Sequence, residues 1–178
     1  MLIWVLSPGL WILAVQRLSH YFLARRQQYG WTPGTVTLRA LCALALRLLV
    51  VITKSDVAAG ICIGGGVYLS DRGHLMLGPQ HIGSGTIIHD RVSIGVRAGN
   101  DVLPVIGEDV WIGPDCVIYG DIAIGDGATV LPGSVLSMSV PARAVVAGNP
   151  AIIVRKNFDN RVLRRSLTSD IDLESLMP

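Results

Sequence analysis

The chain of 178 residues is long enough for one compact domain with a small appendage. Apolar residues make up 51% of it and charged residues 16%, a composition that excludes an intrinsically disordered chain. The formal net charge of +2, without a long run of Lys or Arg, excludes a nucleic-acid-binding function. Cys42, Cys62 and Cys116 lack the spacing of disulfide or zinc sites, so we expect reduced, small apolar fillers in a cytoplasmic protein and no metal site.

Two apolar segments open the chain and predict an N-terminal α-helical segment over residues 1–55. Ser7 and Pro8 fit a helix cap and first turn, and a second helix is expected over 38–53, after a Gly- and Pro-rich linker at 29–34. The second segment is shorter than the roughly 20 residues of a membrane-spanning helix. We expect the helices to pack on each other and on neighbouring chains. Peripheral membrane contact and a true span remain open alternatives.

An aliphatic residue recurs about every sixth position from Val57 onward, which is the strongest pattern in the sequence. Three six-residue edges make one triangular coil with its aliphatic residues on the axis. Small residues are expected where the backbone bends sharply, often with positive φ. The pattern predicts a left-handed parallel β-helix of hexapeptide repeats over residues 56–156, because a β-sandwich would show period two instead. The series reads Val57, Ile63, Leu69, Leu75, Ile82, Ile88, Ile94, Ile106, Ile112, Ile118, Ile124, Val130 and Leu136.

The repeat breaks once and then ends in a cap. Residues 96–105 interrupt it and predict a loop extruded from one corner, where solenoids commonly carry function. Residues 140–151 predict a cap, and the polar, poorly patterned residues 157–178 predict a frayed C-terminal tail.

With these features the chain resembles the serine O-acetyltransferases of the hexapeptide-repeat superfamily and related polysaccharide O-acetyltransferases. The residues that carry the likeness are 7–9 with 16–20, 100–107 and 147–151. The resemblance implies a homotrimer in which acyl-CoA lies in a groove between two β-helices. It also implies a His base that is held by an Asp and takes the acceptor's proton, with an N–H group that stabilises the oxyanion.

The residues that the family uses are only partly present. The resemblance places its orienting Asp at Asp56, its base position at Asp71 and its second His at Val102–Leu103. The base position therefore holds Asp in place of His.

The repeat itself offers a replacement base. Ile88 is expected one coil above Leu69, which would place His89 over Ser70, Asp90 over Asp71, and Arg91 over Arg72. We expect His89 to be the base and Asp71 or Asp90 to orient it, close to the loop that follows Ile94. His74 and His81 are alternative bases, His20 is expected to be structural, and an ordinary solvated polar edge is the alternative to any site here.

The acyl donor is expected to be acetyl-CoA, by the same resemblance. Gly113, Pro114, Pro132 and Gly133 match groove-lining stretches of the family. Arg143, Arg155 and Lys156 are candidates for the nucleotide phosphates, with ordinary surface charge as the alternative.

Three functions are compatible with these residues. The first is acetyl transfer to serine or a serine-like acceptor, which would serve cysteine biosynthesis in the cytoplasm, at most peripheral to the membrane. The second is acetyl transfer to a sugar during exopolysaccharide biosynthesis. The third is a catalytically impaired trimeric scaffold.

Overall fold

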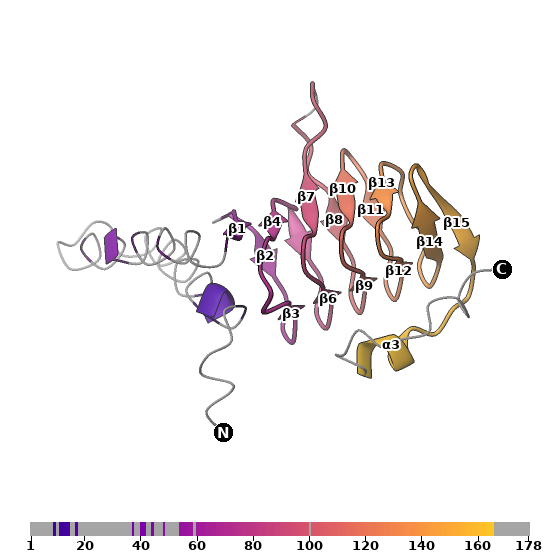
Figure 1. Ribbon diagram of the computed structural model, residues 1–178, viewed down its shortest axis with the longest axis horizontal. Helices are drawn as coiled ribbons and strands as arrows, with labels where there is room; N and C mark the ends of the chain where they lie inside the picture. Colours follow the sequence, from indigo (N-terminus) through magenta and orange to yellow (C-terminus); the bar gives the residue numbers. More distant parts are fainter. Residues whose placement is uncertain are drawn as a thin grey trace, which may run out of the picture.

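A computed structural model describes residues 9, 11–14, 17, 37, 40–41, 44, 48, 54–58, 60–99 and 101–165. Short strands wind around one axis and stack into three sheets, all parallel except the last pair (Figure 1). The predicted fold class, a left-handed parallel β-helix of hexapeptide repeats, is confirmed. The strands are β1 (Asp56–Val57), β2 (Cys62–Ile63), β3 (Tyr68–Leu69), β4 (Met76–Leu77), β5 (His81–Ile82), β6 (Ile87–Ile88), β7 (Ser93–Gly95), β8 (Val105–Ile106), β9 (Trp111–Ile112), β10 (Val117–Tyr119), β11 (Ala123–Ile124), β12 (Thr129–Val130), β13 (Val135–Leu136), β14 (Val145–Gly148) and β15 (Ala151–Arg155).

The three sheets are numbered here in the order in which the chain enters them. Sheet 1 contains β1-β4-β7-β10-β13, sheet 2 contains β2-β5-β8-β11, and sheet 3 contains β3-β6-β9-β12-β14-β15. Each of the first four coils thus places one strand in every sheet, and in the last coil Val140 forms a single bridge in sheet 2. The backbone groups of one coil bond to the coils above and below.

The aliphatic residues of the repeat form one continuous core along the axis. Leu69, Ile88 and Ile112 stack in register and are 2%, 0% and 0% exposed. Each such side chain contributes about 1.5–3 kcal/mol when removed from water. The six-residue period therefore reports burial on a shared axis, as predicted.

One step of the predicted register is wrong. Leu77, and not Leu75, pairs with Val57 and Ile94 in sheet 1. The irregularity lies in the turn at residues 70–74. This turn is two residues longer than the equivalent turns at 89–91, 113–115 and 131–133. Leu75 is also fully buried, so hydrophobicity alone could not distinguish the two leucines.

The glycines that follow the aliphatic residues have a different role from the one expected. A Cβ atom on Gly83 would collide with the backbone of Gly107 in the next coil. Positive φ instead occurs at a later turn position, as at Gly85 (φ 69) and Arg91 (φ 55), three residues after Ile82 and Ile88. Close approach between coils, and not backbone conformation, explains the recurrent Ile-Gly pairs.

The first helix closes the N-terminal end of the β-helix. The described residues of the two predicted helices are helical, and Ile12 and Leu13 belong to the same buried cluster as Val57. Arg17 Nη2 donates a hydrogen bond to the Gly64 carbonyl over 3.0 Å. The linker at 29–34 and His20 lie outside the described residues.

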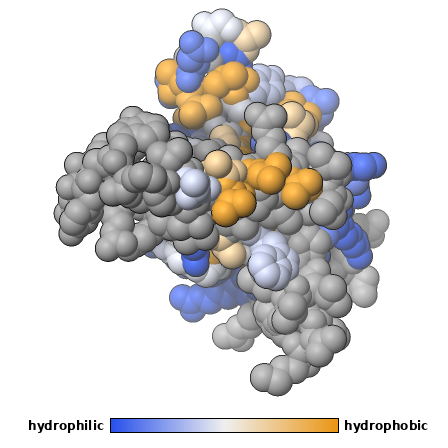
Figure 2. All heavy atoms as spheres, turned by 90° about the vertical axis from the view of Figure 1, so that its left-hand side faces the viewer, coloured by the Kyte–Doolittle hydropathy of each residue, from blue (hydrophilic) through white to orange (hydrophobic). Residues whose placement is uncertain are grey.

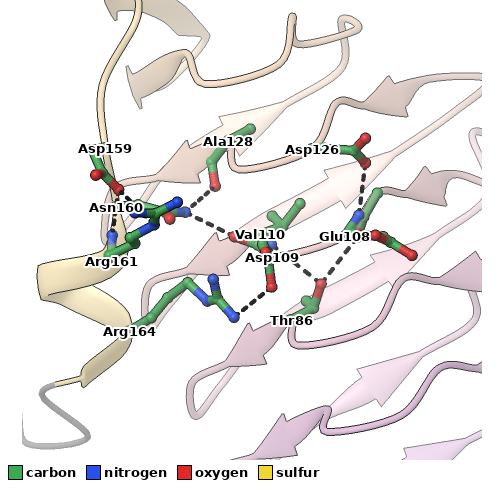
Figure 3. A network of polar contacts seen from close by, with 11 residues as sticks. Thr86, Glu108, Asp109, Val110, Asp126, Ala128, Asp159, Asn160, Arg161 and Arg164 are labelled. Carbon is green, nitrogen blue, oxygen red and sulfur yellow. Dashed lines mark hydrogen bonds and ion pairs between the residues drawn. The ribbon is translucent and has the colours of Figure 1, made fainter.

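The frayed tail expected from residue 157 is wrong for the part that is described. Helix α3 (Arg161–Arg165) returns to the outer face of sheet 3, and Leu163 is buried with Trp111 and Val145. Asn160 Nδ2 donates to the Asp109 carbonyl over 2.9 Å and to the Ala128 carbonyl over 3.3 Å (Figure 3). Too few apolar residues lie in this short segment to show a period, although they are enough to cover one face. Residues 166–178 lie outside the described part.

The extruded loop spans residues 96–104 and is one residue shorter than predicted, because Val105 begins β8. It projects away from the β-helix between β7 and β8 (Figure 1), and Val96, Val102 and Leu103 are exposed on it.

Two of the cysteines are described. Cys116 is buried as expected, whereas Cys62 is exposed, so the prediction that it fills the core is wrong. Cys62 is the outward-facing residue of β2, next to Ile63. Cys42 lies outside the described residues.

Candidate active site

The turns that lead from sheet 3 to sheet 1 stack into one polar edge, called here the site corner. It comprises residues 70–74, 89–91, 113–115 and 131–133 of four successive coils. Ser70 N–H donates to the Ile88 carbonyl and His89 N–H to the Ile112 carbonyl, both over 3.0 Å. The predicted placement of His89 above Ser70 follows from this register.

The next positions of the site corner differ from the prediction. Arg91 N–H donates to the Gly73 carbonyl over 3.4 Å, which aligns Arg91 with His74 and not with Arg72. His74, Arg91 and Asp115 also share the left-handed backbone conformation, with φ of 61°, 55° and 61°. The two extra residues of the lower turn displace Asp71 and Arg72 from the predicted stack.

Arg91 holds together two coils of the site corner. Its Nη1 donates to Asp90 Oδ2 over 2.6 Å, and its Nε and Nη2 donate to the two carboxylate oxygens of Asp115 over 2.5 and 2.7 Å. The Asp90 side chain is 6% exposed and that of Asp115 51%. The bond from Arg91 lowers the pKa of Asp115. The guanidinium thus neutralises two carboxylates.

His89 is the most base-like residue of the site corner. Burial lowers the pKa of its imidazole, with a partly opposing effect from the charge of Asp90 and a further lowering by Arg72. Its ring lies 4.9 Å from that of Trp111, and its buried Nε2 has no hydrogen-bond partner among the described residues. An imidazole with a pKa below 6.5 is neutral at pH 7 and therefore able to accept a proton. Asp90 acts on it through charge, while the Asp90 carboxylate itself is bound by Arg91.

Tyr68 joins this cluster and was not among the predicted site residues. Burial, followed by the charge of Asp71, raises the pKa of its phenol, so the phenol stays protonated and can donate a hydrogen bond. Tyr68 occupies the outward position of β3, below Ile87 of β6. The alternation of inward and outward residues along β3 could have indicated this placement.

Three other predicted catalytic positions lie apart from His89. Asp56 stands on β1 opposite Met76, which separates it from Ser93 of the coil that carries His89. His81 lies on β5 in sheet 2, and His74 is exposed on the turn below Arg91. The extruded loop leaves the end of β7 opposite to His89, so this strand lies between them within one chain.

The predicted acyl-donor residues divide between two places. Gly113, Pro114, Pro132 and Gly133 continue the site corner above His89, and Gly133 N–H donates to the Pro114 carbonyl over 2.9 Å. A Cβ on Gly113 would lie 2.8 Å from Pro132 N, so Gly113 permits the close stacking of these coils. Arg143 lies on the corner that follows sheet 2. Arg155 and Lys156 lie at and just beyond the end of β15, where the Arg155 guanidinium is 5.4 Å from the Phe158 ring centre.

Among the described residues, no group of three or more His, Cys, Asp or Glu side chains could hold a metal ion. Within the same part of the chain, none of the helices has the length and apolar character needed to cross a membrane.

Comparison with known proteins finds a hexapeptide-repeat family and several acetyltransferases. The family "Bacterial transferase hexapeptide (six repeats)" matches residues 104–137. Serine acetyltransferase 2 of Arabidopsis thaliana is 36% identical over 129 residues, which are 70% of this chain and 39% of that protein. A chloramphenicol acetyltransferase of Agrobacterium fabrum is 43% identical over 68 residues, which are 36% of this chain and 32% of that protein.

A solved structure of a serine acetyltransferase in complex with coenzyme A, from Brucella abortus, shares the fold. Its TM-score is 0.71 at 24% identity, covering 84% of this chain and 57% of that one. The matched part of the chain spans 32% and 39% of the length of these two curated relatives. The resemblance thus leaves much of each relative unmatched.

Proposed function

Because the chain is a hexapeptide-repeat protein of the serine acetyltransferase type, we propose that it transfers an acetyl group from acetyl-CoA to a hydroxyl acceptor at the site corner. The observation that carries the proposal is the half-buried imidazole of His89, whose Nε2 atom is buried, on a polar edge of the β-helix. The acetyltransferase relatives support the chemistry.

The site corner supplies the proton transfer that such a reaction needs. A hydroxyl is a poor nucleophile at pH 7 unless a base removes its proton during attack on the thioester carbonyl. The His89 imidazole takes that proton and becomes imidazolium. When the tetrahedral intermediate collapses, the C–S bond breaks and the departing thiolate of CoA takes the proton. His89 then returns to its neutral form.

Neighbouring groups favour this cycle. The Asp90 carboxylate stabilises the imidazolium through its charge, and the Tyr68 phenol is a hydrogen-bond donor in the same cluster. Gly113, Pro114, Pro132 and Gly133 give the corner above His89 a close-packed, side-chain-poor surface. We assign the acyl chain of acetyl-CoA to that surface. The CoA complex of the Brucella abortus relative supports the choice of donor.

Serine or a serine-like amino acid is our preferred acceptor, because a relative matched over 70% of this chain is a serine acetyltransferase. A sugar hydroxyl is the alternative. Release of CoA thiol from acetyl-CoA, measured with L-serine and with a panel of sugars, separates the two. Turnover with serine supports the first acceptor and turnover with a sugar alone supports the second. CoA binding without turnover of either would contradict the enzymatic proposal.

Substitution of the base provides the second test. His89→Ala should lower kcat/KM by about 10²–10⁴-fold, the usual contribution of general-base catalysis. His74→Ala tests the alternative base, and Ser137→Ala, an exposed position remote from the site corner, is the control. A large loss in His74→Ala with none in His89→Ala would assign the base to His74.

We also propose a homotrimer acting in the cytoplasm, where acetyl-CoA is available. A single β-helix offers one wall to the thioester, and Met76 and Val117 expose apolar surface on sheet 1, as Val105 does on sheet 2. Sedimentation equilibrium should give three times the 19.0 kDa of one chain. A monomer with full activity would contradict this assembly.

A further inference from the structure

The second N-terminal helix exposes a line of leucines that no part of the β-helix covers. Leu41, Leu44 and Leu48 are 62%, 57% and 56% exposed. Their spacing of three and four residues places them on one face of a helix. We call these three residues the leucine seam. Figure 2 looks onto this end of the molecule and shows apolar side chains gathered on it.

The seam is not needed to close the β-helix. The first helix already does so, through Ile12 and Leu13 in the axial core and the hydrogen bond from Arg17 to Gly64. Exposing three leucines together carries a cost that a soluble surface normally avoids, so a contiguous apolar face of this kind indicates a binding surface.

Charge is distributed very unequally along the chain. Residues 1–55 contain six Arg and Lys residues and no Asp or Glu, whereas residues 56–178 contain nine basic and thirteen acidic residues. The aromatic residues follow the same division, since six of the ten Trp, Tyr and Phe residues lie within residues 1–31.

A second copy of the chain is a poorer occupant of the seam. Pairing two seams would bring two purely basic segments together, and like charges oppose that contact. The seam also extends over two helical turns, while a coiled coil needs about three to four heptads.

We propose that the leucine seam docks on the surface of an anionic lipid bilayer, with the helix lying in the interface. The first helix is attached to the first coil of the β-helix, so docking holds that end of the β-helix nearest the lipid. This contact is independent of the proposed acetyl transfer.

Vesicle flotation of the full chain tests the proposal. Binding is expected to vesicles of phosphatidylcholine mixed with phosphatidylglycerol, to be weaker with phosphatidylcholine alone, and to decrease as salt is raised. Replacing Leu41, Leu44 and Leu48 together by Ser should weaken binding by roughly tenfold or more. Val162→Ser, which alters an exposed apolar residue on α3, is the matched control and should bind like wild type.

The seam is exposed, so the triple variant should keep the circular dichroism spectrum and melting temperature of the wild type. Unchanged vesicle binding by a folded triple variant would overturn the proposal. So would a triple variant whose molecular mass falls while its lipid binding persists, because that result would assign the seam to a second copy.

Discussion

Two corners of the β-helix turn the chain sharply from one sheet into the next, and they do so with different residues. Directly after the axial aliphatic residue, the corner that follows sheet 2 has Gly64, Gly83, Gly107 and Gly125, and a Cβ on any of them would collide with the coil above. At the equivalent position the site corner has Ser70, His89, Gly113 and Leu131. The corner after sheet 2 is too tight for a side chain at all four positions, whereas the site corner has room for one at three of its four positions and not at Gly113.

The difference shows where this repeat can carry chemistry. A solenoid imposes similar backbone geometry on every coil, so a corner that accepts side chains is the place where functional groups can be added. Left-handed residues other than glycine occur at both corners, since Asp109 and Arg143 lie after sheet 2. On the site corner, Arg91 and Asp115 take this conformation despite a cost of roughly 1–2 kcal/mol per residue, and they bind each other there.

The largest expected effect tests the tightness of the sheet 2 corner. Gly83→Ala should lower the free energy of unfolding by about 3 kcal/mol, because its Cβ meets the backbone of Gly107 with nothing flexible to move. Gly95→Ala, where a Cβ would meet nothing within 4 Å, is the control and should change stability by less than about 1 kcal/mol. Urea denaturation measures both, and equal effects would abolish the distinction.

A smaller effect distinguishes the two carboxylates bound by Arg91. Asp90→Asn should cost about 1–2 kcal/mol of stability, because the Asp90 side chain is nearly buried and its charge-assisted hydrogen bond is lost. Asp115→Asn should cost less than about 1 kcal/mol, since that pair is half exposed and screened by water. The reverse order in denaturation experiments would show that burial does not control these pairs.

Residues with a left-handed backbone conformation allow a third comparison between the two corners. Arg143→Gly, on the corner after sheet 2, should raise stability by about 0.5–1 kcal/mol by relieving a positive φ. In Arg91→Gly the same relief should be offset by loss of the bonds to Asp90 and Asp115. A stability gain of equal size in both variants, measured by urea denaturation, would show that the Arg91 pairs contribute nothing.

The smallest expected effect is a pH dependence of stability. Burial lowers the pKa of His89 below its unfolded value of 6.5, so the unfolded chain binds a proton more readily. The stabilisation from neutral His89 is complete above pH 6.5 and is lost as pH falls towards the folded pKa. His89→Gln should flatten this part of the stability–pH curve. An unchanged slope below pH 6.5 would contradict the lowered pKa.

The sequence predicts the β-helix well because one physical requirement, burial on a shared axis, recurs in every coil. The stacking of Ile88 on Leu69, and hence of His89 on Ser70, follows from that period alone. Leu75 was misassigned because a two-residue insertion left both Leu75 and Leu77 buried.

The other differences arise from contacts that no period encodes. Tyr68 lies in the site because it occupies the outward position of β3, and Leu163 of the short helix α3 packs against sheet 3. The Arg91 bonds to Asp90 and Asp115 depend on side-chain reach across two coils. Such contacts depend on how the coils align in space, which the local sequence around each residue does not indicate.

The pH profile of acetyl transfer tests the role of the site corner most directly. With neutral His89 as the base, kcat/KM should rise with pH along an ascending limb centred below 6.5 and reach a plateau near neutrality. In His89→Ala that limb should vanish and the plateau should fall by at least about 100-fold. A variant that retains both the wild-type limb and the wild-type rate would show that the reaction takes place elsewhere.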